Sequence, residues 1–196
     1  MNDLGVELSA NALITSKTDL SGKIVYINSD FVKYSGFSER EVFGKPHNIV
    51  RHGDMPRAVF KLLWSYVKSG KEVFAFVKNK TKDGGHYWVF ANVTPSYDMA
   101  QNIVGFYSVR RQANPKAIAQ IARIYAQMKE AESRSVGESE AVLGAILQES
   151  KMSYNQLILA MQNGGFSGDE ILSKRRRGGA SGGTDNAPGN VAGGAL

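Results

Sequence analysis

The sequence contains no cysteine among its 196 residues and only three histidines, His47, His52 and His86. The absence of cysteine excludes disulfides, thiolate metal sites, cysteine nucleophiles and a covalent flavin–cysteinyl adduct. No run reaches the roughly 18 to 20 consecutive apolar residues that a membrane-spanning helix needs. The first residues also lack a basic segment followed by an apolar one. We therefore expect a cytoplasmic protein unless a partner carries it to a membrane.

Negative charge is scarce in the first two thirds of the chain. The first 130 residues hold 18 Lys and Arg against 11 Asp and Glu, whereas the remainder is nearly balanced. Such an excess attracts nucleic acid, an anionic surface or an anionic small ligand, and it does not distinguish among them. With 42% hydrophobic residues, the chain can form one core of about 100 to 150 residues with appendages.

The pattern of apolar residues predicts five strands with helices inserted after the second. Residues 12–28 indicate a hairpin with its turn at 19–22. Short turns join three later strand-like runs, at 72–80, 85–97 and 102–111. Between the hairpin and these runs, helical patterns occupy 29–34, 39–43 and 54–69. We therefore expect an α+β fold, a five-stranded antiparallel sheet with helices on one face.

A second pattern begins at Pro115. It predicts helices interrupted at Gly137 and continued over 141–161, with apolar residues turned toward a partner. These C-terminal helices could pack back on the sheet, dimerise or dock on another protein. From Gly164 the chain is rich in Gly, Ser, Ala and Asn and is expected to be a disordered tail. Its basic run at 174–177 is more typical of a solubilising tail than of a nucleic-acid site, so no nucleic-acid partner is expected.

These patterns divide the chain into four regions. We expect an N-terminal segment over 1–11, a main domain over 12–112, a C-terminal helical segment over 113–163 and the tail over 164–196. Inside the main domain, a cationic loop from His47 to Pro56 precedes an amphipathic helix. Asp54 is placed to cap that helix and Pro56 falls in its first turn. Such a loop suits the mouth of a pocket and is equally typical of a solvated helix start.

Three separated motifs carry a resemblance to a known family. They are His47-Asn48-x-Val-Arg-His-x-Asp-Met-Pro56, Val77-Lys78-Asn79 and His86-Tyr87-Trp88-Val89-x-Ala91-Asn92-Val93-Thr94-Pro95. With these motifs in this order, residues 12–112 resemble the flavin-binding PAS domains of aerotaxis and energy-taxis proteins, the Aer type. The resemblance implies a PAS fold that holds FAD noncovalently and reports its redox state. It implies no enzymatic activity.

The resemblance also implies a class of partner. The chain is similar to the short soluble adaptors of energy taxis, the CetB-like proteins. Such an adaptor works with a methyl-accepting chemotaxis-type receptor or another HAMP-containing membrane protein. A homodimer through the PAS domain or the C-terminal helices is a second expected mode of association.

FAD needs cations for its diphosphate, amide donors for its ring edge and apolar or aromatic walls. By resemblance, Arg51, His52 and Asp54 correspond to the family's FAD-binding loop. Asn79 continues the two-residue period of the apolar residues before it, so its amide is expected to face the interior and bind a ring edge. Trp88 either stacks on the ring or fills the core. Asn28 either binds the cofactor or caps the following helix.

Two positions depart from the family pattern. Gly53 stands where proline is expected, and Phe90 stands where arginine is expected; either change could weaken flavin binding. A haem gas sensor, with His52 or His47 as axial ligand, is an alternative. A ligand-free interaction module is another, its pocket filled by aromatic side chains: Phe74, Phe76, Trp88 and Phe106. The chain has no Ser-His-Asp arrangement, metal cluster or phosphate-binding glycine loop, so we expect no enzyme.

Overall fold

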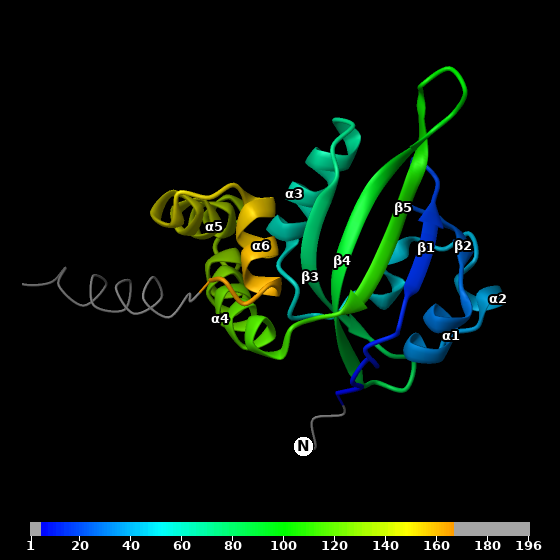
Figure 1. Cartoon of the computed structure of the whole chain (residues 1–196), viewed down its shortest axis with the longest axis horizontal. Helices are drawn as coiled ribbons and strands as arrows, with labels where there is room; N and C mark the ends of the chain where they lie inside the picture. The colour runs from blue at the N-terminus through cyan, green and yellow to red at the C-terminus, as the bar shows by residue number, and fades with distance from the viewer. Residues whose placement is uncertain (1–4, 167–196) are drawn as a thin grey trace, which may run out of the picture.

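The structure, a computed structural model, describes residues 5–166. Its centre is a five-stranded antiparallel sheet in the order β2-β1-β5-β4-β3 (Figure 1). The predicted sheet is therefore confirmed, with strand ends close to those expected. The strands are β1 (Ile14–Thr18), β2 (Ile24–Ile27), β3 (Val73–Lys80), β4 (His86–Tyr97) and β5 (Ile103–Gln112).

Four helical segments connect β2 to β3. They are α1 (Ser29–Ser35), α2 (Glu39–Val42), the 3₁₀ helix η1 (His47–Val50) and α3 (Arg57–Lys68). Side chains of η1 and α3 share one cavity with residues of β1, β3, β4 and β5, which places these two segments over a single face of the sheet. We call this face the inner face. The expected order of two strands, helices and three strands is confirmed.

The helix α3 does not begin as the sequence suggested. Its N-cap is Pro56, which makes no side-chain capping bond. The carboxylate of Glu132 instead accepts a hydrogen bond from the Arg57 backbone N–H at 2.5 Å. The prediction that Asp54 caps this helix is wrong, because the helix starts three residues later and Asp54 pairs with Lys78 Nζ at 2.8 Å. A distant residue thus performs the capping role that a local one was expected to fill.

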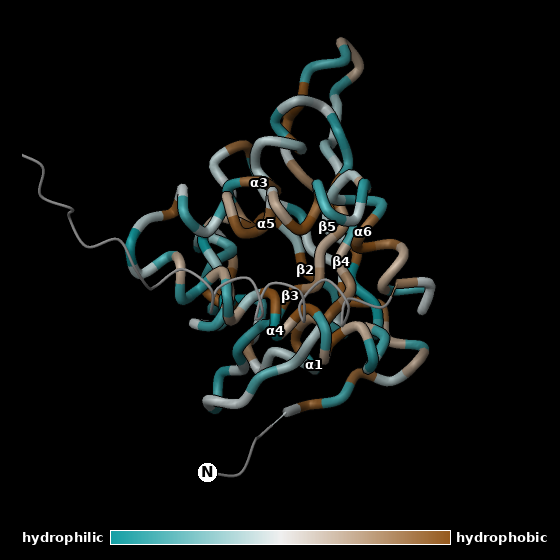
Figure 2. The backbone as a smooth tube through the Cα atoms, turned by 90° about the vertical axis from the view of Figure 1, so that its left-hand side faces the viewer, coloured by the Kyte–Doolittle hydropathy of each residue, from teal (hydrophilic) through white to brown (hydrophobic). Residues whose placement is uncertain are grey.

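The C-terminal helices pack back on the body of the protein. They are α4 (Pro115–Glu132), α5 (Val136–Ser150) and α6 (Tyr154–Gln162), and they lie beside β3 and α3 (Figure 1). Figure 2 views the molecule from this side and shows hydrophobic segments concentrated toward the centre. The apolar residues expected to face a partner are mostly buried within this chain; Leu143, Ile146, Leu157, Ile158 and Met161 are all in the core.

The predicted break at Gly137 is wrong. Gly137 lies inside the first turn of α5, which Ser135 caps by accepting a hydrogen bond from the Glu138 N–H at 3.1 Å. The helix ends instead at Lys151, which adopts a left-handed conformation with φ of 54°. A glycine near a helix start is tolerated, and the serine cap outweighs its weak helix propensity.

The edge strand β3 is sealed by side chains of these helices. The Tyr125 hydroxyl donates to the Phe76 carbonyl at 2.9 Å. The side chain of Asn155 accepts from the Phe74 N–H at 3.0 Å and donates to the Glu72 carbonyl at 3.1 Å. An open edge strand is a template for unwanted pairing, so the C-terminal helices give β3 backbone partners that no neighbouring strand supplies.

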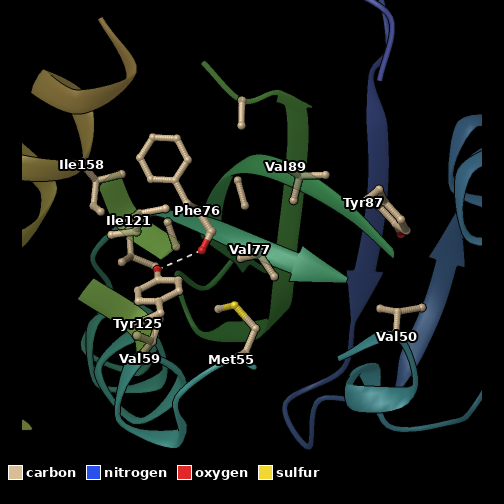
Figure 3. Close-up of a cluster of buried hydrophobic side chains, with 14 of the residues drawn as sticks. Val50, Met55, Val59, Phe76, Val77, Tyr87, Val89, Ile121, Tyr125 and Ile158 are labelled. Carbon is tan, nitrogen blue, oxygen red and sulfur yellow. Dashed lines mark hydrogen bonds between the residues drawn. The ribbon is translucent and has the colours of Figure 1, made fainter. Parts of the chain in front are cut away.

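The core is continuous across the two sides of β3. Figure 3 shows Phe76 directed toward Ile121 and Ile158 of the C-terminal helices, whereas Val77 lies with Met55 below it. Successive residues of a strand point to opposite faces. The second face of the sheet, here called the outer face, is thus covered by α4 and α6 where it meets β3.

Between residues 5 and 166, none of the helices combines the length and apolar character needed to cross a membrane. The basic run at 174–177 and the part of the expected tail beyond residue 166 lie outside the described residues.

Replacing Tyr125 with phenylalanine tests the attachment of α4 to β3. The Phe76 carbonyl loses its partner in a buried setting, so Tyr125→Phe should lower the free energy of unfolding by about 1 to 2 kcal/mol. Urea denaturation of the purified full chain measures this change. Tyr26→Phe, on a tyrosine that is 43% exposed, should shift it by less than about 0.5 kcal/mol. Equal stability of both variants would contradict the assigned contact.

Candidate functional site

A cavity of about 480 Å³ lies between the inner face of the sheet and the segments η1 and α3. We call it the inner cavity. Its volume falls within the roughly 300 to 1,000 Å³ of small-molecule sites. Its walls are mainly apolar and aromatic, formed by Leu20, Phe60, Leu63, Trp64, Val77, Ala91, Val93 and Phe106. The cavity is therefore large enough and apolar enough to hold a ring system.

The charge of the inner cavity is of one sign. Arg51, Lys68 and Arg110 line it, and no Asp or Glu of the described residues does so. A charge in an apolar surrounding interacts more strongly with an opposite charge than it does in water. The inner cavity is therefore suited to a ligand that is anionic or rich in hydrogen-bond acceptors.

Arg110 is the most unusual of these cations because it is only 5% exposed. Its Nη2 donates to Ser16 Oγ at 3.0 Å and to His47 Nε2 at 2.8 Å. No carboxylate between residues 5 and 166 forms an ion pair with it. Burial lowers the pKa of Arg110 to about 10. A buried cation without a counter-charge is energetically costly, so this position favours a ligand that supplies negative charge or acceptors.

The sequence analysis did not single out Arg110, although a signal was present. Phe106, Ser108 and Arg110 alternate along β5 and share the inner face, as their pairing with Pro95, Val93 and Ala91 shows. A charged residue that continues such a period is placed on a buried face. That signal became visible only once the facing strand was known.

His47 is partly buried beside Arg110. Because a guanidinium only donates, His47 Nε2 must accept this hydrogen bond, which assigns the neutral ring with its proton on Nδ1. Burial, reinforced by the charge of Arg110, lowers the pKa of His47 to about 3. The electron pair that a haem iron would need at Nε2 is therefore already engaged by Arg110 and by Ser16 Oγ at 3.0 Å. Within the described residues, no three His, Asp or Glu side chains form a metal-binding group.

Three further polar groups of the inner cavity are buried without partners. They are Asn79 Nδ2, Ser108 Oγ and Thr18 Oγ1, which form no hydrogen bond with any described residue. Asn79 lies across the strands from Tyr87, and burial raises the pKa of Tyr87 to about 12, while Arg110 and the Asn79 side chain act in the opposite direction. The Asn79 side chain is thus close enough to Tyr87 to affect its pKa, but the two do not meet hydrogen-bond geometry. Unpaired buried polar atoms are rare and costly. A ligand with both donors and acceptors would satisfy them.

Arg51 stands where the cationic loop meets the sheet. Its backbone bridges to Asn79, and its Nη2 donates to the Met55 carbonyl at 2.8 Å. Its guanidinium lies 4.4 Å from the ring centre of Phe60, a cation–π contact. Burial lowers the pKa of Arg51, which still carries its charge at neutral pH. The side chain is therefore fixed at the rim of the inner cavity.

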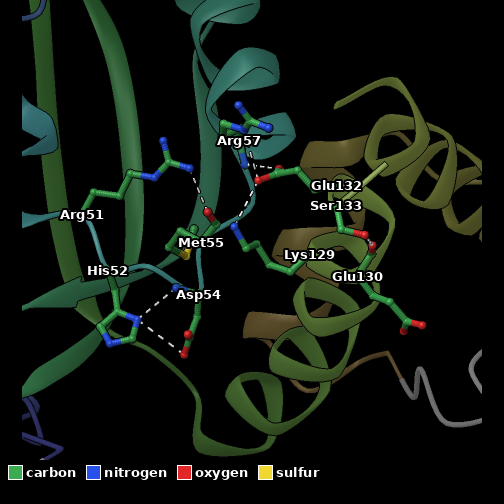
Figure 4. Close-up of polar contacts among 9 residues, drawn as sticks. All are labelled: Arg51, His52, Asp54, Met55, Arg57, Lys129, Glu130, Glu132 and Ser133. Carbon is green, nitrogen blue, oxygen red and sulfur yellow. Dashed lines mark hydrogen bonds and ion pairs between the residues drawn. The ribbon is translucent and has the colours of Figure 1, made fainter. Parts of the chain in front are cut away.

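Two further residues of the cationic loop, His52 and Asp54, lie outside the inner cavity. Asp54 Oδ2 is 2.8 Å from Lys78 Nζ. It is also 3.4 Å from His52 Nδ1, as Figure 4 shows. Burial lowers the pKa of His52, and the hydrogen bond from Lys78 lowers that of Asp54. His52 and Asp54 do not line the inner cavity, although the resemblance had placed both in cofactor binding.

The structure places Asn28 and Trp88 in other settings. Asn28 caps α1 by accepting from the Phe31 N–H at 3.1 Å, and it accepts from the Thr15 N–H at 2.9 Å. Trp88 faces the outer side of the sheet, where its ring is 6.3 Å from that of Tyr125. Neither residue lines the inner cavity. Of the six residues proposed from the sequence, the structure brings only Arg51 and Asn79 together there.

The two departures from the family pattern do not touch the inner cavity. Phe90 lies on the outer face with its ring stacked on Phe74 at 5.7 Å and 12°. A side chain at Gly53 would meet nothing within 4 Å, and this glycine does not need a left-handed backbone. Of the four aromatic residues that would fill the pocket of a ligand-free module, only Phe106 lines the inner cavity.

A second cleft, of about 950 Å³, lies where the cationic loop and α3 meet α4. We call it the basic cleft, because Arg51, Arg57, Lys80 and Lys129 line it against a single carboxylate, Glu132. Figure 4 shows Arg57, Glu132 and Lys129 joined by ion pairs beside the Arg51–Met55 contact. The basic cleft and the inner cavity share Asn48 and Arg51.

Comparison with known proteins identifies relatives of this fold. The profile described as PAS fold matches residues 8–111. The aerotaxis receptor of Escherichia coli (strain K12) is 40% identical over 118 residues, which are 60% of this chain and 23% of the receptor. The nitrogen fixation regulatory protein of Klebsiella oxytoca is 22% identical over 96 residues, or 49% of this chain and 19% of that protein. This chain therefore spans less than a quarter of either relative.

Among solved structures, the dark structure of the blue-light photoreceptor Aureochrome1 LOV is similar with a TM-score of 0.49. Its sequence identity is 22%, and the match covers 63% of this chain and 88% of that one.

The burial of His47 predicts a specific dependence of stability on pH. Its pKa is about 3 in the folded protein and about 6.5 when unfolded. Below pH 6.5 the unfolded state therefore binds a proton that the folded state does not, and the free energy of unfolding falls as the pH decreases toward 3. The slope contributed by this group approaches about 1.4 kcal/mol per pH unit.

Urea denaturation between pH 7.5 and pH 5 measures this slope before most carboxylates titrate. His47→Gln should flatten it over that interval. His52→Gln should retain most of it, because the His52 ring is partly exposed. A slope that His47→Gln leaves unchanged would show that this ring is not buried in its neutral form.

Proposed function

Because the chain belongs to the PAS fold family, we propose that its inner cavity binds FAD noncovalently and that the protein is a redox sensor. The cofactor is the ligand that the resemblance implies. The inner cavity offers the cations, the amide donor and the aromatic walls that such a ligand requires. The relation to the aerotaxis receptor supports a role in taxis signalling.

The observation that carries the proposal is a set of buried polar groups without partners. The Arg110 guanidinium forms no ion pair with a carboxylate of the described residues. Three polar atoms, Asn79 Nδ2, Ser108 Oγ and Thr18 Oγ1, have no hydrogen-bond partner there either. A flavin ring edge alternates donors and acceptors, which these groups complement. Trp64 and Phe106 lie in edge-to-face contact at 5.3 Å and form one wall. The residues present therefore fit the cofactor.

When bound, a flavin would supply a redox centre whose charge and hydrogen bonding differ between its oxidation states. The protein's own residues would respond through β3. Asn79 lies on this strand, and its backbone is bridged to Arg51 of the cationic loop. The same strand is bonded to Tyr125 and Asn155 of the C-terminal helices. A rearranged Asn79 amide would therefore act on two segments at the surface.

We place the receiver of this signal among membrane-bound chemotaxis proteins, either a methyl-accepting receptor or another HAMP-containing protein. The support is the 40% identity to part of the aerotaxis receptor, of which this chain spans 23%. Co-purification of the full chain with such a receptor from the same organism tests this partner. Equal recovery of the full chain with an unrelated membrane receptor would contradict it.

The absorption spectrum of the purified full chain, before and after dithionite, tests the cofactor. Two flavin bands that bleach, with FAD in the extract by chromatography, would support the proposal. A Soret band would overturn it in favour of haem. A featureless spectrum that stays featureless after incubation with FAD would overturn it in favour of a ligand-free interaction module.

Removing one unpaired donor tests the site. Asn79→Ala should lower the flavin content at least about tenfold, because a hydrogen bond made in a buried setting is lost. Arg51→Ala should lower it as well. Asn92→Ala is the matched control, since this asparagine lies on the outer face of β4 and binds Glu72 at 3.1 Å. Unchanged flavin stoichiometry in both Asn79→Ala and Arg51→Ala would remove the proposed site.

Arg110→Met separates a binding role from a structural one. Without a ligand the buried charge has no carboxylate partner among the described residues, so relief of its desolvation cost should offset the hydrogen bonds lost at Ser16 and His47, and the free energy of unfolding of the flavin-free protein should change by less than about 1 kcal/mol. The flavin content should nevertheless fall sharply. Arg111→Met, an exposed neighbour on the same strand, should change neither quantity. A loss of several kcal/mol in the flavin-free Arg110→Met protein would show that Arg110 is chiefly structural.

A further inference from the structure

The basic cleft joins the PAS domain to the C-terminal helices. Its walls come from the cationic loop, from α3 and β3, and from α4. Lys129 of α4 lies outside the region matched by the PAS profile, which ends at residue 111. The basic cleft is therefore a feature that this chain builds only with its helical extension in place.

The charge of the basic cleft is strongly positive. Arg51, Arg57, Lys80 and Lys129 contribute four positive charges, and Glu132 is the only carboxylate on its wall. Lys80 is exposed and has no ion-pair partner among residues 5–166. Four cations around one opening repel each other, so the arrangement favours an anionic ligand.

Glu132 does not neutralise this cluster from the open side. Its side chain is 4% exposed, and its carboxylate accepts from the Arg57 N–H at 2.5 Å, from Arg57 Nε at 3.3 Å and from Lys129 Nζ at 3.1 Å. These bonds fix Arg57 and Lys129 from the buried side of the basic cleft. The remaining N–H groups of both side chains, which are 61% and 38% exposed, stay available to a ligand.

The basic cleft adjoins the inner cavity, because Arg51 and Asn48 line both. A ligand whose ring occupies the inner cavity and whose chain passes Arg51 would therefore enter the basic cleft. FAD has this form, with a ring at one end and a diphosphate and adenosine at the other. The ring of FAD thus corresponds to the apolar inner cavity, and its anionic diphosphate corresponds to the basic cleft.

We propose that the basic cleft binds the diphosphate and adenosine half of FAD, with Lys129 of α4 and Arg57 of α3 as anion-binding residues. This inference rests on the proposed flavin site. It makes the C-terminal helices part of the cofactor site and predicts a preference for the dinucleotide over smaller flavins. Glu132 acts as a positioning residue for both cations.

Calorimetric titration of the flavin-free full chain with FAD and with riboflavin tests this assignment, because riboflavin has the ring without any phosphate. Lys129→Gln should weaken FAD binding about tenfold, the loss expected for one charge-assisted hydrogen bond. Riboflavin binding should change less than about twofold. Lys116→Gln, at the far end of the same helix and outside the basic cleft, should leave both affinities unchanged.

The ratio of the two affinities separates the outcomes. A destabilised or partly unfolded variant would lose both ligands alike, and such an equal loss would overturn the inference, as would FAD binding that Lys129→Gln leaves intact. The double variant Lys80→Gln/Lys129→Gln should lower the FAD to riboflavin ratio further, and an unchanged ratio there would also overturn it. If wild-type protein binds FAD and riboflavin equally, the inference fails while the flavin site stands. If it binds neither, the proposed function fails and the inference falls with it.

Discussion

A guanidinium buried under the sheet without a carboxylate is the constraint around which this molecule is organised. The buried N–H groups of Arg110 need acceptors, and Ser16 of β1 and His47 of η1 supply two of them. These two bonds tie the central strand, its neighbour and the segment that crosses over them. They also force His47 to remain a neutral acceptor. The charge is still uncompensated, so the space in front of it stays a polar-lined cavity instead of closing into an apolar core.

The second organising contact is the Glu132 carboxylate at the start of α3. A helix N-terminus presents N–H groups that need acceptors, and local side chains usually supply them. Here the acceptor comes from α4, 75 residues further along the chain. Because the cationic loop lies between the inner cavity and this contact, the C-terminal helices hold the mouth of the cavity as well as the edge of β3. The inner cavity and the C-terminal helices are therefore joined by direct contacts at α3 and at β3.

The two faces of the sheet have opposite chemistry. The inner face carries Asn79, Ser108 and Arg110 beside small apolar residues, whereas the outer face near β3 carries Phe74, Phe76 and Phe90. The same alternation divides the motif at the start of β4, because Tyr87 and Val89 point inward while Trp88 and Phe90 point outward. Neighbouring residues of one motif therefore point to opposite sides of the sheet, alternate residues toward the inner cavity and the others toward α4 and α6.

Periodicity in the sequence was sufficient to predict the five strands, the inserted helices and the inward direction of Asn79, since each depends on residues close together in the chain. The resemblance of three motifs located the cationic loop. Other features depend on contacts between distant segments: the pairing of β5 with β4 that turns Arg110 inward, the capping of α3 by Glu132, and the removal of Trp88 to the outer face. No local pattern records which strand lies opposite or which helix covers an edge, because register and packing are set by burial of the whole chain. For that reason the order of strands and helices could be predicted from the amino-acid sequence. Which residues line the inner cavity was decided only by the pairing and packing of distant segments.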